Sequence, residues 1–348
     1  MSYLPEDTTF YASIILLLTF LVMLALYRPH LRPFLSRTPR PTISHTSPGN
    51  TKSTKRNLHP IFQTVAEYLP WANVEKVAPN DTPGKLKPAP APANTPANKI
   101  LQPFDAFLVL DFEGTCTETS SFDYPNELIE FPVILMRWKD KDSSGKASEL
   151  VVVDQFHSFI RPTWKPKLTE FCTKLTGITQ YQVDIAPDFF SVLLLVRAFL
   201  VKHDLIDSLT GHAKTRFSWC QDGPWDLGDL LTKQCFHSRL DPPKWLQNNI
   251  IDVRRMVKLW MAEKTGQPPG PVGLNIEGQL AVLDLKFEGR LHSGLDDTKN
   301  ISRIVAELAR RGLQLQPNLR VTPRKRFGWM GKSGRVLEDR IKDSKFKR

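Results

Sequence analysis

Cysteine is scarce in this chain, and its spacing excludes two classes of protein. The 348 residues contain four cysteines, none in a C-x-x-C pair and none in a Cys/His cluster. This spacing argues against a zinc site and against a disulfide-stapled secreted domain. We therefore expect free thiols in a reducing compartment, at Cys116, Cys172, Cys220 and Cys235.

Charged residues are absent from residues 8–27, which are almost entirely apolar. A helix of this length spans roughly 30 Å, the thickness of a bilayer's hydrocarbon core. No Lys or Arg precedes the run and no small-x-small site follows it, which argues against a cleaved signal peptide. Glu6 and Asp7 likewise argue against a mitochondrial presequence. The sequence therefore predicts a single-pass membrane helix, with the C-terminal part in the cytoplasm because arginines follow the run.

Positive charge is concentrated at the two ends of the chain. The formal net charge is +11, yet residues 1–100 hold 11 Lys/Arg against 5 Asp/Glu and residues 314–348 hold 11 against 3. The body between them is therefore slightly acidic. We divide the chain into a short N-terminal segment (1–7), the membrane helix (8–27), a basic and then Pro-rich linker with enough apolar residues for one short helix (28–102), a folded domain (103–313) and a basic tail (314–348).

The folded domain has the pattern of an α/β protein. The apolar run "FLVL" and the segments "NELIEFPVILMRWK" and "ASELVVVDQFHSFIRP" are typical of three consecutive strands. Segments with apolar residues at helical spacing follow, with "FSWC" as a further strand between them. Strands followed by alternating helices and strands predict a mixed sheet with helices on its faces.

Two acidic residues, Asp111 and Glu113, directly follow the apolar run. Residues two apart on a strand point to the same side, so we expect the two carboxylates to lie together. Two buried like charges repel unless a divalent cation compensates them, and carboxylate oxygens suit Mg²⁺ or Mn²⁺. Taken alone, the pair is equally explained by a turn-capping Asp and an exposed Glu.

Further acidic motifs lie downstream. Asp226 follows Trp225 in "GPWDLGDLL", and His292 stands five residues before Asp297 in "RLHSGLDDTKN". The set D-x-E, W-D and H-x4-D resembles the motifs of the DEDDh (DnaQ-like) 3′–5′ exonucleases. The blocks "DFEGTC", "NELIEFPVIL", "FCTKLTGITQYQVD", "DGPWDLGDLL" and "HSGLDDTKNISRI" are similar, in this order, to the Eri-type subfamily that contains the histone-mRNA 3′-end exoribonuclease. The resemblance covers about residues 103–313.

The resemblance implies an RNase H-like exonuclease fold, with a mixed five-stranded sheet flanked by helices. It also implies roles for named residues. Asp111, Glu113, Asp226 and Asp297 match the acids that bind two Mg²⁺ ions, for which Mn²⁺ can substitute. His292 matches the general base, and with Glu113 it forms the catalytic pair. Glu113, Gly114, Thr115 and His292 match the positions that contact the terminal nucleotide, although position 114 is often Ala in relatives.

We therefore expect a metal-dependent exoribonuclease that trims single-stranded RNA 3′ ends to nucleoside 5′-monophosphates, with no zinc or nucleotide cofactor. The preference for RNA rests on the resemblance, and DNA remains an alternative substrate. A non-catalytic, membrane-tethered RNA-binding scaffold is the alternative from another class. The chain shows neither a SAP module nor a zinc finger, so stem-loop specificity does not carry over.

Other polar and aromatic residues near these motifs have plainer interpretations. Asp296 reads as a helix-start residue, and Asp222 as either a support for the site or a turn residue. We expect a solvated or structural role for Glu127 and Glu130, and surface or core positions for the histidines outside the motif. The Trp residues outside Trp225 read as core or rim residues, with base stacking as an alternative to test for Trp164 and Trp219. Phe327 and Trp329 of the basic tail are candidates for base stacking. That tail equally fits a disordered segment or one attracted to an anionic membrane.

Overall fold

The computed structural model describes residues 99–268, 270, 273–322 and 325–341. The predicted membrane helix, residues 8–27, lies outside these ranges, as does nearly all of the predicted linker. Among the described residues, no helix is long and apolar enough to cross a membrane. The longest of them, Gly294–Arg310, has 17 residues and carries charged side chains. This finding contradicts the predicted single-pass membrane localisation, which we do not retain.

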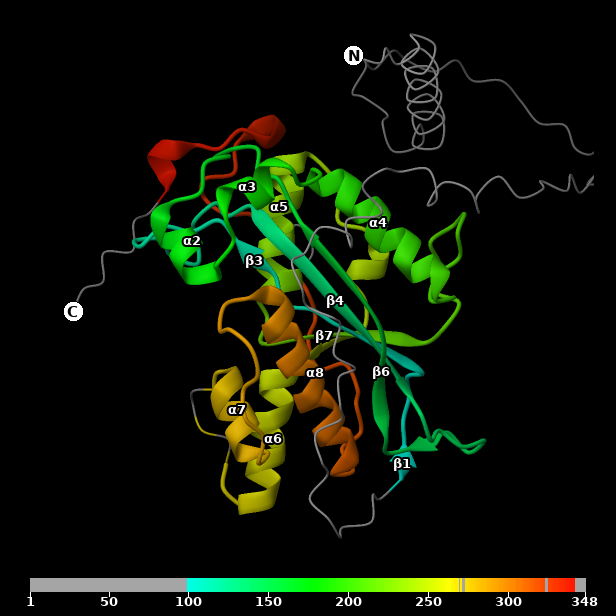
Figure 1. Cartoon of the computed structure of the whole chain (residues 1–348). Helices are drawn as coiled ribbons and strands as arrows, with labels where there is room; N and C mark the ends of the chain where they lie inside the picture. Colours follow the sequence, from blue (N-terminus) through cyan, green and yellow to red (C-terminus); the bar gives the residue numbers. More distant parts are fainter. Residues whose placement is uncertain (1–98, 269, 271–272, 323–324, 342–348) are drawn as a thin grey trace, which may run out of the picture. The chain divides into compact units, whose positions relative to one another are not determined.

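A mixed sheet forms the centre of the domain (Figure 1). Strand β4 runs antiparallel to β2 and to β6, whereas β7 pairs parallel with β2 and with β8. The strands are β2 (Ala106–Val109), β3 (Glu113–Gly114), β4 (Leu128–Trp138), β6 (Leu150–Phe159), β7 (Phe217–Gln221) and β8 (Ile250–Asp252). A separate antiparallel pair joins β1 (Ile100–Leu101) to β5 (Lys146–Ala147).

Strands β2 and β3 lie along the same edge of β4 and form one interrupted strand. Val109 pairs with Ile134, and Glu113 pairs with Glu130 further along β4. Counted in this way, the sheet of six strands has the five positions that the sequence predicted. The interruption falls at residues 110–112, where the two acids of interest begin.

Helices cover both faces of the sheet (Figure 1). One core cluster joins Leu108 of β2 to α4 and α5, and a second joins Phe107 and Val109 to α6, α7 and α8. This division follows from the strand, because neighbouring residues point to opposite faces. The helices are α2 (Glu170–Thr176), α3 (Gln180–Asp184), α4 (Phe189–Lys202), α5 (Leu231–Ser238), α6 (Val253–Thr265), α7 (Ile276–Val282) and α8 (Gly294–Arg310), with the short helical turns η3 (Asp226–Leu230), η4 (Lys244–Leu246), η5 (Lys332–Gly334) and η6 (Glu338–Arg340).

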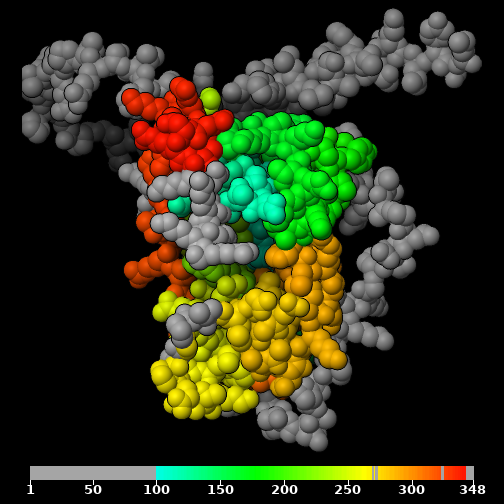
Figure 2. All heavy atoms as spheres, turned by 90° about the vertical axis from the view of Figure 1, so that its left-hand side faces the viewer, coloured from blue at the N-terminus to red at the C-terminus, as the bar shows by residue number. Residues whose placement is uncertain are grey.

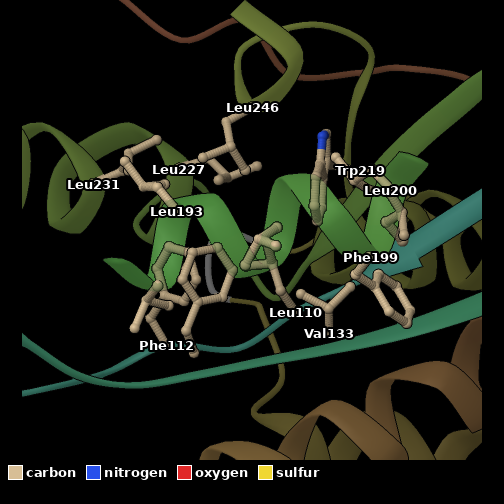
Figure 3. Close-up of a cluster of buried hydrophobic side chains, with 14 of the residues drawn as sticks. Leu110, Phe112, Val133, Leu193, Phe199, Leu200, Trp219, Leu227, Leu231 and Leu246 are labelled. Carbon is tan, nitrogen blue, oxygen red and sulfur yellow. The ribbon is translucent and has the colours of Figure 1, made fainter. Parts of the chain in front are cut away.

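The residues that flank Asp111 anchor the interruption in the core. Leu110 and Phe112 are buried and belong to the cluster with α4 and α5, where Figure 3 shows their side chains among Val133, Leu193 and Leu227. The backbone N–H of Leu110 donates to the carbonyl of Cys220 at 3.0 Å. The segment therefore keeps a strand-like alternation after ladder pairing with β4 stops.

Candidate active site

Asp111 and Glu113 point away from the cluster that buries Leu110 and Phe112, because side chains alternate along the extended segment. On that side they meet Asp297 of α8. Each of the three acids offers a carboxylate oxygen, and these atoms lie within 4.8 Å of one another. The structure therefore brings together three of the four acids that the motifs singled out.

Asp297 reaches the other two acids because the start of α8 packs closely on the strands. A Cβ atom added to Gly294 would lie 2.8 Å from the carbonyl oxygen of Asp111 and 2.9 Å from Oε2 of Glu130. Glu130 accepts hydrogen bonds from the backbone N–H groups of Gly294 (3.0 Å) and Leu295 (3.3 Å). Ser293, at the N-cap position, makes no side-chain cap bond. A carboxylate from β4 thus caps the helix that carries Asp297.

Asp226, the fourth acid, lies at the start of the π-helical turn η3. Its Oδ1 accepts a hydrogen bond from the backbone N–H of Phe112 at 3.0 Å. Phe112 lies in the interruption between β2 and β3, where no strand pairing with β4 is made, and its N–H is bonded to Asp226 instead. The bond connects Asp226 to the chain between Asp111 and Glu113. Asp226 lies outside the group of three, although its charge acts on Asp111. Single π-helical turns of this kind are frequent at functional sites.

Burial raises the pKa of all four carboxyl groups, and neighbouring acids add to the effect. Asp111 and Glu113 are raised well above the ordinary range, first by loss of solvent and then by the charges of nearby acids. Burial raises the pKa of Asp226 and of Asp297 to about 7. In the absence of a compensating cation, the folded chain therefore holds protons on this cluster near neutral pH.

The cluster fits a divalent metal ion. Oδ1 of Asp297 is buried, and none of the described residues forms a hydrogen bond with it, which is costly for a carboxylate oxygen unless a cation approaches it. Oxygen ligands of this kind suit hard cations such as Mg²⁺ and Mn²⁺. The residues present are therefore a consistent ligand set for such ions.

His292 lies in the exposed turn that leads into α8. Its backbone has φ of 60°, in the left-handed region that residues other than glycine rarely adopt. Its backbone N–H donates to the Asp297 carboxylate, which lowers the pKa of that acid and partly opposes burial. The strained turn therefore places the histidine beside the acidic cluster with its side chain open to solvent.

Gly114 and Thr115 continue directly from Glu113. A Cβ atom at Gly114 would meet its nearest neighbours at 3.5 Å, which is ordinary contact, so an alanine fits there. Thr115 is buried, and its hydroxyl accepts a hydrogen bond from the N–H of Glu127 at 3.0 Å. Its carbonyl accepts one from Asn126 at 2.6 Å. Both residues therefore belong to a segment that is fixed against the start of β4.

Apart from Asp222, for which a supporting role was one of two expectations, sequence reasoning did not anticipate the contacts made by the polar residues around the site. Glu130 was expected to have a structural role, but not to cap α8. Asp222 forms an ion pair with Arg254 and accepts a hydrogen bond from Gln279 at 2.7 Å, so it supports the site instead of forming a turn. Glu127 accepts bonds from Thr163, Trp164 and Lys165 and holds that loop. These contacts join distant segments, and no local motif marks them.

Most of the aromatic rings considered for base stacking are buried, so RNA bases cannot reach them. Trp219 is fully buried, in agreement with the core or rim position expected for it. Phe327 and Trp329 are 8% and 1% exposed, so the prediction that these two rings stack on bases is wrong. Trp329 stacks on Phe327 and on His237, and His237 stacks on Trp164. The start of the basic tail is thus packed on the domain because its aromatic rings find apolar partners there.

The mixed sheet with helices on both faces, and an acidic cluster where β2, η3 and the start of α8 meet, define a class: metal-dependent phosphodiester hydrolases of RNase H-like fold. The comparisons with known proteins agree. Residues 108–305 match the family model described as Exonuclease. The chain therefore belongs to the exonuclease family, and its relatives place it with the Eri-type 3′–5′ exonucleases.

The relatives include the 3′-5′ exonuclease eri1 of Schizosaccharomyces pombe, 32% identical over 64% of this chain and 74% of that protein. The human 3′-5′ exoribonuclease 1 is 34% identical over 62% of this chain and 55% of its own length, and the chain spans 58% of the rat protein. Among solved structures, the nuclease domain of 3′hExo, a DEDDh family member bound to rAMP, is similar with a TM-score of 0.54 and 32% identity, over 64% of this chain and all of that domain.

Proposed function

We propose that this protein is a Mg²⁺-dependent 3′–5′ exoribonuclease that removes nucleoside 5′-monophosphates from single-stranded RNA 3′ ends. The observation that carries the proposal is the convergence of Asp111, Glu113 and Asp297 within 4.8 Å, with Asp226 bonded to the backbone between the first two. The names of the relatives support RNA as the substrate: two are called 3′-5′ exoribonuclease 1, and one solved structure shows 3′-end recognition of a histone mRNA stem-loop by a 3′-exonuclease.

In this proposal Asp111, Glu113, Asp226 and Asp297 hold the metal ions. Two bound divalent cations supply positive charge to the attacking and leaving oxygens of a phosphodiester and favour ionisation of a water molecule. The chain's own residues do the rest. His292 accepts the proton of the attacking water, because its imidazole is exposed beside the acidic cluster and an imidazole nitrogen can act as a general base. The backbone at Gly114 and Thr115 positions the terminal nucleotide.

The test uses the full-length chain and a 5′-labelled single-stranded RNA with Mg²⁺. We expect a ladder that shortens from the 3′ end, and no ladder in EDTA. Asp111→Asn and His292→Ala should each lower the rate by at least about 10²-fold. Glu149→Gln, on a half-exposed side chain that pairs with Lys139, is the matched control and should retain full activity.

Two other outcomes would replace the proposal. RNA that is bound equally well with Mg²⁺ or EDTA, and never shortened, would identify a non-catalytic scaffold. A matched DNA strand degraded faster than RNA would identify a DNA exonuclease, since only RNA offers the 2′-hydroxyl.

A further inference from the structure

An exposed aromatic ring lies beside the acidic cluster, outside the motifs. Phe122 is 72% exposed, although phenylalanine is usually buried. Its ring stacks on that of Trp225, with centroids 5.6 Å apart and planes within 17°. Trp225 immediately precedes Asp226, so the stack is built on the residue next to an acid of the site.

Trp225 offers Phe122 a fixed support. The Arg254 guanidinium carbon lies 4.9 Å from the Trp225 ring centroid, and Arg254 pairs with Asp222. A Cβ atom at Gly223 would overlap the Trp225 ring at 2.1 Å, so the indole packs directly on the backbone there. The indole is therefore held by Gly223 and Arg254, and Phe122 extends the stack outward.

The loop that carries Phe122 is also held in place. The buried Lys233 donates from Nζ to the carbonyl of Phe122 at 2.5 Å and to Oδ1 of Asn126 at 2.9 Å. Trp329 donates from Nε1 to the carbonyl of Asp123. Two consecutive carbonyls of the loop thus have buried partners, so the exposure of the Phe122 ring does not result from a lack of loop contacts.

The position of this ring suits a polymeric substrate. The loop leaves the site at Thr115, and the cyan part of the chain that includes it reaches the surface between α2, α8 and the red C-terminal segment in Figure 2. An RNA strand whose 3′ nucleotide sits at the acids extends from them over the protein surface, where the Phe122 ring is exposed. Unpaired bases stack on aromatic side chains with little regard to sequence.

We propose that Phe122 is a stacking contact for an unpaired base of the RNA, upstream of the nucleotide being removed. The inference rests on the proposed function and extends it to a residue that the catalytic motifs do not contain. Phe122 supplies affinity for the strand and takes no part in the chemical step.

The test compares wild type, Phe122→Ala and Phe122→Trp on RNA oligonucleotides. Loss of one stack should raise KM at least about fivefold with kcat within about twofold. Phe122→Trp should restore KM, because it keeps an aromatic face. Leu209→Ala, which removes a side chain of similar exposure (73%) from the turn before β7, is the control and should change nothing.

An abasic scan then identifies the partner. A single abasic nucleotide is placed at successive positions from the 3′ end, and KM is measured for wild type and for Phe122→Ala. At one position the missing base should raise the KM of wild type several-fold and leave the KM of the variant unchanged, since the two changes remove the same contact. An equal increase in KM for the two proteins at every position would overturn the proposal, because Phe122 would then contact no base of the RNA.

Hydrolysis of uridine 5′-(p-nitrophenyl phosphate), which offers a single nucleotide, separates stacking from loop damage. Phe122→Ala should hydrolyse this ester at the wild-type rate. An equal decrease in kcat/KM on the ester and on RNA would refute the stacking role. Wild-type protein that degrades neither substrate with Mg²⁺ would instead refute the proposed function itself.

Discussion

Two glycines beside the acids differ in what surrounds them. At Gly294 an added Cβ meets a backbone carbonyl at 2.8 Å, which cannot move aside as a flexible side chain can, whereas at Gly114 the nearest atoms are 3.5 Å away. The same substitution therefore has opposite consequences at the two positions.

Gly294→Ala should shift the start of α8 and displace Asp297 from the other acids. We expect kcat/KM on single-stranded RNA to fall by about 10²-fold, the usual scale for a misplaced catalytic group. Gly114→Ala is the matched control and should keep activity within about twofold. Comparable rates for the two variants would show that α8 has room to move.

At this scale the sequence predicted the acids but not their supports. Asp111, Glu113, Asp226 and Asp297 stand in recognisable spacings, and the structure brings three of them together with Asp226 bonded nearby. Glu130 carries no such spacing, because it meets α8 from 164 residues earlier in the chain. Phe122 was missed for the same reason: its partner Trp225 is distant in sequence.

Among the elements, α8 shows how a helix depends on a residue outside itself. Its N-terminal N–H groups donate to Glu130, and the side chain of Ser293 makes no cap bond. Glu130 also contacts Nε2 of His157 at 2.7 Å. A local reading of the sequence would assign the cap to Ser293 instead.

Glu130→Gln should therefore destabilise the protein and lower its activity, while Ser293→Ala should change neither. Losing one of the two acceptors leaves a buried N–H group without a partner, at a cost of about 1–3 kcal/mol. Urea denaturation gives the free energy of unfolding, and the RNA assay gives the rate. A larger effect of Ser293→Ala would assign the cap to the serine.

The sequence predicted strands β2, β4, β6 and β7 because alternation and run length are local properties, but it predicted neither β8 nor the break after β2. Residues 110–112 read as a continuation of an apolar strand. The break depends on Asp226, which takes the N–H of Phe112 from another part of the chain.

For the molecule as a whole, the acidic cluster couples stability to pH. Asp226 and Asp297 have folded pKa values of about 7 against ordinary values of 3.8. Between these limits the folded chain binds more protons than the unfolded chain, so stability falls as pH rises.

In EDTA we expect the melting temperature to decrease between pH 4.5 and pH 7, with a loss of roughly 3 kcal/mol in the free energy of unfolding for each of these two acids. Mg²⁺ should restore stability more at pH 7 than at pH 4.5, because it binds the ionised carboxylates. Asp226→Asn/Asp297→Asn is the control and should flatten the profile. A melting temperature that rises over this interval in EDTA would contradict the burial of these acids.

The start of the basic tail contributes to the fold in spite of its charge. Trp329 is 1% exposed and stacks on Phe327 and His237. Trp329→Ala should cost about 3–5 kcal/mol, measured by urea denaturation, as for other large buried rings. Arg340→Ala, an exposed change in the same segment, is the control; equal stability of both variants would show that the packing is unimportant.

The bond from Trp329 to the carbonyl of Asp123 joins residues 206 positions apart. During synthesis the loop therefore leaves the ribosome long before its partner has been translated. A nascent chain stalled before residue 329 therefore carries all four acids but lacks the contact that holds the carbonyl of Asp123.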